Sequence, residues 1–109
     1  MVKRMNRRDK NREQATVCLG VAWYRKEQWN RLLEIADDRN NLEDTYEEWK
    51  ANAERGLRRL ARPGFVPQKV DIDVEELIHW CKLKKRPVNG AARSIFTAEK
   101  LRKQIKANQ

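Results

Sequence analysis

Two aspartates, Asp71 and Asp73, are the residues of this chain whose type and spacing most directly suggest catalysis. Side chains two positions apart on a strand point to the same face, and paired carboxylates hold Mg²⁺ in nucleases and phosphotransferases. A structural role explains them without further assumptions, because Asp73 followed by Glu76 matches a capping box at a helix start. We adopt the structural interpretation and predict no metal site and no cofactor. A small metal-dependent hydrolase is the minor alternative.

The chain has one histidine, His79, and two cysteines, Cys18 and Cys81. These three side chains have no evident fourth partner for a zinc site. His79 and Cys81 lie two apart on a predicted helix, so they point about 200° from each other and the histidine cannot easily activate the thiol. The four glycines are dispersed and form no phosphate-binding loop. We therefore predict a solvent-facing His79, reduced and buried cysteines, and no enzymatic activity.

Basic side chains are the strongest binding candidates. They lie at the end of the predicted helix over about 74–85 and along the last predicted helix. The candidate nucleic-acid-binding residues are Lys82, Lys84, Lys85, Arg86, Arg93, Lys100, Arg102 and Lys103. Nucleic-acid phosphates attract such cations without sequence preference. Two alternatives stay open: a helix-turn-helix that reads base edges, and cations that only keep the chain soluble or dock on an acidic protein. Among the aromatic residues, Trp80 or Tyr24 is the one we would expect at a ligand.

Charge is distributed unevenly along the chain. Residues 1–14 carry six basic and two acidic side chains, residues 15–81 carry ten and thirteen, and residues 82–109 carry nine and one. The formal net charge of +9 therefore comes from the two ends. This pattern predicts a flexible basic arm over residues 1–14, followed by a single domain over residues 15–109 with a basic C-terminal helix.

Length and composition exclude several classes of protein. A chain of 109 residues has material for one core. No apolar run approaches the ~20 residues that span a bilayer, and the basic start lacks the apolar stretch of a signal peptide. Two widely separated cysteines do not form the disulfide framework of a small secreted domain. We therefore expect a cytoplasmic protein without membrane contact.

The elements that must position these residues can be read from the spacing of apolar side chains. Alternation predicts strands over about 16–23 and 66–73, and spacing by threes and fours predicts helices over about 25–37, 42–61, 74–85 and 90–105. Asn41 is the expected N-cap of the second helix, whose acidic first half and arginine-rich last turns complement the helix dipole. The predicted fold class is α+β, predominantly helical, in the order β-α-α-β-α-α.

A two-stranded sheet is marginal by itself, because both of its edges remain unpaired. Pairing with a second copy would give a four-stranded sheet, so we predict a homodimer. The competing interpretation is a mostly helical monomer in which residues 16–23 are extended or continue into the first helix. The predicted core consists of Val17, Leu19, Val21, Trp29, Leu33, Tyr46, Trp49, Leu57, Leu60, Val70, Ile72, Leu77, Cys81, Ile95 and Phe96.

These patterns favour a non-enzymatic binding module that contacts an anionic partner, most directly nucleic acid, through the basic C-terminal half. The alternative is a protein–protein adaptor or structural dimer without a nucleic-acid role.

Overall fold

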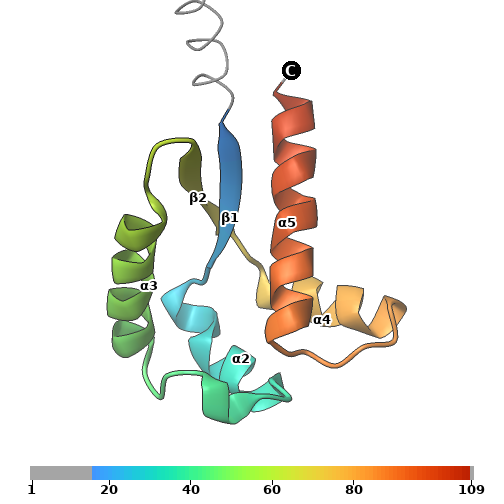
Figure 1. Cartoon of the computed structure of the whole chain (residues 1–109). Helices are drawn as coiled ribbons and strands as arrows, with labels where there is room; N and C mark the ends of the chain where they lie inside the picture. Colours follow the sequence, from blue (N-terminus) through green and yellow to red (C-terminus); the bar gives the residue numbers. More distant parts are fainter. Residues whose placement is uncertain (1–15, 109) are drawn as a thin grey trace, which may run out of the picture.

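A computed structural model describes residues 16–108, and the predicted basic arm over residues 1–14 lies outside these described residues. The chain folds into a small sheet of two strands, flanked by helices (Figure 1). The elements are β1 (Val17–Trp23), the 3₁₀ turn η1 (Lys26–Gln28), α2 (Trp29–Ile35), the 3₁₀ turn η2 (Arg39–Asn41), α3 (Tyr46–Leu60), β2 (Phe65–Asp71), α4 (Val74–Leu83) and α5 (Gly90–Ala107). The predicted class and element order are therefore confirmed. No helix of this part of the chain is long and apolar enough to cross a membrane.

The two strands are parallel, and their register runs from Val17 opposite Phe65 to Trp23 opposite Asp71. Parallel strands cannot be joined by a tight hairpin, so the chain crosses over through α2 and α3 before β2 begins. Within residues 16–108 the sheet has two strands, so the predicted four-stranded dimer stays a prediction.

The hydrogen bonds at the two ends of this ladder show which backbone groups face inward. The Val17 amide donates to the Gly64 carbonyl at 2.8 Å, and the Ile72 amide donates to the Trp23 carbonyl at 3.0 Å. Backbone groups of a strand alternate between its two sides. The odd-numbered residues of β1 therefore bond to the even-numbered residues of β2.

The two edges of the sheet, neither of which is paired by another strand within residues 16–108, consequently differ. Along β1, the residues Cys18, Gly20 and Ala22 direct their amides and carbonyls outward. Along β2, the outward set includes Pro67, which has no amide hydrogen to offer. A proline in this position removes no bond to β1 and weakens the outer edge as a template for another strand.

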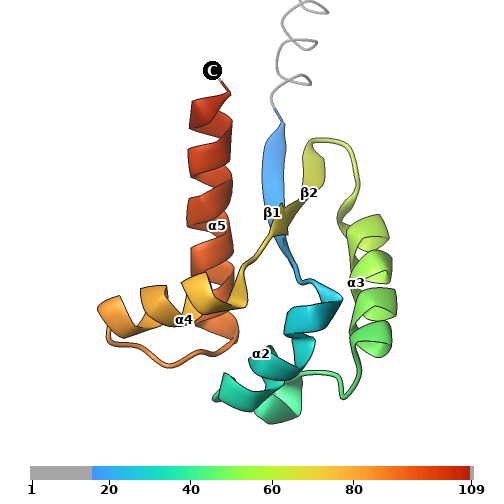
Figure 2. The same cartoon turned by 180° about the vertical axis from the view of Figure 1, so that it is seen from behind.

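The helices α3 and α5 cover opposite faces of the sheet, as Figures 1 and 2 both show. A Cβ atom on Gly20 would meet the side chains of Leu101 and Thr97 at 3.3 Å, so glycine allows β1 to approach α5 closely. On the other face, Trp23 packs against Trp49 of α3 with ring centroids 5.1 Å apart. Residues on both faces of β1 are therefore in contact with a helix.

An aromatic cluster joins α3 to β1 and α2. The ring of Trp49 lies 5.2 Å from that of Tyr24 and 5.4 Å from those of Trp29 and Tyr46, measured between centroids. Trp49, Tyr24 and Trp29 are buried. Each such pair adds about 0.5–1.5 kcal/mol beyond the burial of its area, so Trp49 is the centre of the packing on this side of the sheet.

The core agrees with the sequence prediction in part. The predicted residues Trp29, Trp49, Val70, Ile72, Leu77 and Cys81 are buried, and Tyr24, Leu32, Val74, Ala92 and Leu101 join them. The prediction was wrong for Val17 and Ile95, whose exposed fractions are 50% and 41%. Val17 lies at the exposed start of β1, and α5 buries Ala92, Thr97 and Leu101 in place of Ile95.

Two of the helix starts test predicted caps. The Asp73 carboxylate accepts a hydrogen bond from the Glu76 amide at 3.0 Å, which confirms the predicted cap of α4. The predicted Asn41 cap is wrong, because Asn41 lies in η2 and α3 begins four residues after Leu42 with Thr45 as its N-cap. As a result α3 has 15 residues and is shorter than predicted.

The Thr45 hydroxyl accepts a hydrogen bond from the Glu48 amide at 3.1 Å. Thr45→Ala leaves that amide without its partner, so we expect a loss of about 1 kcal/mol in the free energy of unfolding measured by urea titration. Asn40→Ala, at an exposed position of η2, is the control and should have little effect. An equal loss in Asn40→Ala would contradict the assignment of Thr45 as the N-cap of α3.

Gly56 lies inside α3, and a Cβ atom there would meet nothing within 4 Å. Because glycine disfavours helix interiors, Gly56→Ala should raise the free energy of unfolding by about 0.5–1 kcal/mol. Gly64 gives the contrast, since its φ of +86° strains any other residue and Gly64→Ala should destabilise the chain. Loss of stability in Gly56→Ala would mean that the space beside α3 is filled.

Candidate nucleic-acid interface

The first group of predicted site residues lies at the far end of α4 and in the connection to α5. Lys82, Lys84 and Lys85 are exposed there. Arg86 is half-buried, with its guanidinium carbon 5.7 Å from the centre of the Trp80 ring. Residues 84–89 separate the two helices, a connection longer than the three- or four-residue turn of a DNA-reading helix-turn-helix.

Arg93 is not an available cation. Its guanidinium donates two hydrogen bonds of 2.8 Å to the carboxylate of Asp38, and the side chains are only 11% and 17% exposed. The same carboxylate accepts the Gly90 amide at 3.0 Å. The hydrogen bonds from Arg93 lower the pKa of Asp38 below its usual value. The sequence-based assignment of Arg93 to a nucleic-acid site is therefore corrected to a structural role.

The remaining predicted residues lie along α5. Lys100 pairs with Glu76 of α4 at 3.1 Å and is 27% exposed, so it links the two helices. Arg102 and Lys103 are exposed on the last turns of α5, well away from the α4–α5 connection. The eight predicted residues therefore do not form one surface: they divide between the tip of α4, two ion pairs and the end of α5.

The structure brings together a different set of cations. Both α3 and α5 run toward the end of the molecule where β1 and β2 begin; α5 reaches it, and α3 ends partway along the strands (Figures 1 and 2). We call this region the basic end, formed by Arg58, Arg59, Arg62, Arg102, Lys103 and Lys106. All six side chains are exposed, and within residues 16–108 none forms an ion pair. Residue 16 precedes β1 at this end, so the basic arm is joined to the domain beside these cations.

Sequence reasoning missed the α3 part of this set because it assigned those arginines only to the helix dipole. The sequence signal for these residues is three arginines, Arg58, Arg59 and Arg62, that follow an acidic helix start. It could not be used without knowing that α3 and α5 run in the same direction.

The two aspartates first considered for catalysis are bound by a cation of the chain itself. Arg25 bonds to the Asp71 carboxylate at 3.3 Å and lies 3.5 Å from that of Asp73. The Glu76 amide holds the pKa of Asp73 below its usual value. No group of three or more metal-ligating side chains occurs within the described chain. This geometry fits the structural interpretation of the pair.

The other reactive side chains are also separate. His79 is exposed, as predicted, and Cys81 is buried, which raises the pKa of its thiol. Cys18 is exposed on β1, so the prediction that both cysteines are buried was wrong for this one. Like Val17, it lies near the exposed start of β1.

Of the two aromatic ligand candidates, Tyr24 is excluded from base stacking because it is only 4% exposed. Burial raises the pKa of its phenol to about 12, so the hydroxyl stays protonated. Trp80 is half-buried, packs on Phe96 at 5.5 Å and donates its indole N–H to Glu99 at 3.3 Å. Both rings therefore have partners within the fold.

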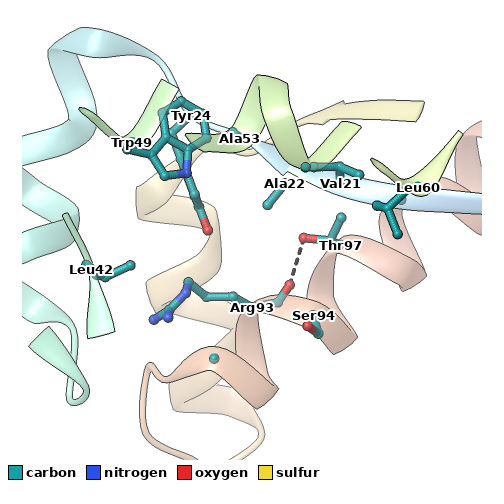
Figure 3. A pocket seen from close by; sticks show the side chains of 13 residues that line it. Val21, Ala22, Tyr24, Leu42, Trp49, Ala53, Leu60, Arg93, Ser94 and Thr97 are labelled. Carbon is teal, nitrogen blue, oxygen red and sulfur yellow. Dashed lines mark hydrogen bonds between the residues drawn. The ribbon is translucent and has the colours of Figure 1, made fainter. Parts of the chain in front are cut away.

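A groove lies between α3 and α5, with β1 as its floor (Figure 3). Its volume is about 390 Å³. Trp49, Ala53, Gly56 and Leu60 line the α3 wall, and Gly90, Arg93, Ser94 and Thr97 line the α5 wall. The Thr97 hydroxyl donates to the Arg93 carbonyl at 2.7 Å, so it is satisfied within α5. One wall is thus apolar and the other small and polar.

Comparison of the chain with models of known protein families, with curated proteins and with solved structures found no match.

The Asp38–Arg93 pair predicts a pH-dependent stability. Asp38→Asn leaves the Arg93 charge buried without its counterion, so we expect the free energy of unfolding to fall by about 2–4 kcal/mol near neutral pH. Because the folded-state pKa of Asp38 is lowered, its contribution is complete above the unfolded value of about 4 and is lost as pH falls through the folded value.

Urea titrations of the wild-type chain and Asp38→Asn from pH 7 to about pH 3 check this, and the difference between them should shrink at the acid end. Asp37→Asn is the control, because only its backbone amide is engaged, with Val88 at 2.8 Å. A difference that did not change with pH would contradict an ionised Asp38 in the folded state.

Proposed function

We propose that this chain is a non-enzymatic binding module for nucleic acid, and that it contacts phosphates through the basic end. The observation that carries the proposal is the common direction of α3 and α5, which gathers cations from two helices at one end of the fold. Within residues 16–108 none of these six cations forms an ion pair. The binding is sequence-independent, since phosphate contacts carry no base information.

Charge along α3 supports the same orientation. Its N-terminal region is acidic and already paired in places: Glu47 bonds to Lys26 at 3.1 Å and Asp44 to Arg39 at 2.9 Å. The arginines at its other end have no such partners among the described residues. A polyanion is therefore attracted to one end of the molecule and repelled from the other. The predicted arm, residues 1–14, has six basic residues. It precedes β1, which begins at the attracting end of the molecule.

The test is a fluorescence-anisotropy titration of RNA and duplex DNA of about 20 nucleotides, at KCl concentrations from about 50 to 300 mM. We expect affinity to fall steeply as log[KCl] rises. The triple variant Arg58→Gln, Arg59→Gln and Arg62→Gln should weaken binding to both nucleic acids and reduce the salt slope by about 2–3.

The matched control is Lys82→Gln, Lys84→Gln and Lys85→Gln, which removes the same formal charge from the tip of α4. We expect its slope to stay close to that of the wild-type chain. Equal losses in both variants would show that only the net charge matters, and a larger loss in the α4 variant would move the interface there. Absence of salt-dependent binding would contradict the proposal.

A further inference from the structure

We infer that the groove between α3 and α5 binds an extended segment of a partner protein, which adds to the free edge of β1 as a third strand. The backbone provides the first reason. Cys18, Gly20 and Ala22 direct their amides and carbonyls away from β2, and Gly20 and Ala22 line the groove. Extended peptides commonly bind through such unpaired edges.

The second reason is the difference between the two edges of the sheet. The outer edge of β2 lacks a donor at Pro67, which protects it from pairing. On β1 the donors at Cys18 and Gly20 are retained, and both residues are exposed. The β2 edge is therefore less able to pair with another strand, whereas the β1 edge keeps the donors that a ladder of hydrogen bonds requires.

Gly56 provides the third reason. It sits on the α3 wall of the groove, and no atom of the fold lies within 4 Å of the position its Cβ would occupy. Contacts within the described chain thus do not explain a glycine that disfavours the helix. Close approach of another backbone to the wall does explain it.

The walls define the chemistry of the occupant. Side chains of an added strand alternate between the two faces of the sheet, so they point in turn toward α3 and toward α5. The α3 wall offers Trp49, Ala53 and Leu60, whereas the α5 wall offers Ser94 and Arg93, the latter already neutralised by Asp38. The expected segment alternates apolar with small or polar residues and has no proline where it faces β1.

A single segment fits this position better than a second copy of the chain. Two-fold pairing of β1 with its copy is antiparallel and places both α5 helices on one face of a continuous sheet. Because α5 packs over β1, the helices would be separated by little more than the strand spacing of about 4.8 Å, whereas packed helices need about 8–10 Å.

The experiment begins with selection from a displayed library of random decapeptides on the full chain. The strongest binder is then titrated into isotope-labelled protein, and amide exchange is followed residue by residue. We expect enriched peptides to show the alternation given above. Binding should slow exchange at Cys18, Gly20 and Ala22, while the amides of Leu19 and Val21, which already bond to β2, should change little.

Two variants keep the result falsifiable. Cys18→Pro removes only an outward donor and should weaken peptide binding by up to about tenfold, whereas Cys18→Ser keeps the donor and the affinity. Gly56→Leu, on another element, should fill the groove and abolish binding. Nucleic-acid affinity should be unchanged in all three, which separates this inference from the proposed function.

The inference is overturned if no peptide is enriched, or if enriched peptides bind Cys18→Pro and Gly56→Leu as well as the wild-type chain. Sedimentation of the free protein is the last check. A dimer that Cys18→Pro dissociates would show that the occupant of the edge is a second copy, and this result would also overturn the assignment to a partner segment.

Discussion

The parallel pairing of β1 with β2 is the constraint on which the rest of this structure depends. Since both strands begin at the same end, the chain must return along the length of the sheet between them, and α3 makes that return. After β2, α4 leads the chain aside and α5 runs back in the direction of α3. The C-terminus of α5 then lies beside the strand starts, and that of α3 points the same way, which brings the cations of the basic end to one side of the fold.

Two contacts hold the helices in this arrangement from opposite sides. The aromatic cluster around Trp49 fixes α3 to β1 and α2. The ion pair of Asp38 with Arg93 joins the crossover connection to the start of α5, and the bond between the Asp37 amide and the Val88 carbonyl reinforces it. Because β1 lies between the two contacts, the groove above it is a consequence of how the fold is closed and does not depend on a mobile loop.

The sequence predicted those features that depend on neighbouring residues. Strand positions, the order of elements and the Asp73 cap follow from local spacing. Features that join distant residues could not be read. Asp38 and Arg93 are 55 positions apart, and their charges resemble those of any exposed pair. Val17 was misplaced because alternation identifies a face of β1 but does not show which residues lie at the exposed start of the strand. The predicted site residues do not form one surface for a related reason: cations adjacent in sequence separate along α4 and α5, and which cations of α3 lie toward the same end as those of α5 follows only from the helix directions.

Pro67 has a consequence for assembly in concentrated solution. Open-ended fibres built by edge-to-edge stacking require every subunit to offer two competent edges, one for the preceding subunit and one for the next. Among the described residues, the β2 edge lacks the donor at Pro67, and two β1 edges are kept apart by their α5 helices. Both routes to stacking through the sheet are therefore disfavoured, although β1 itself is not covered.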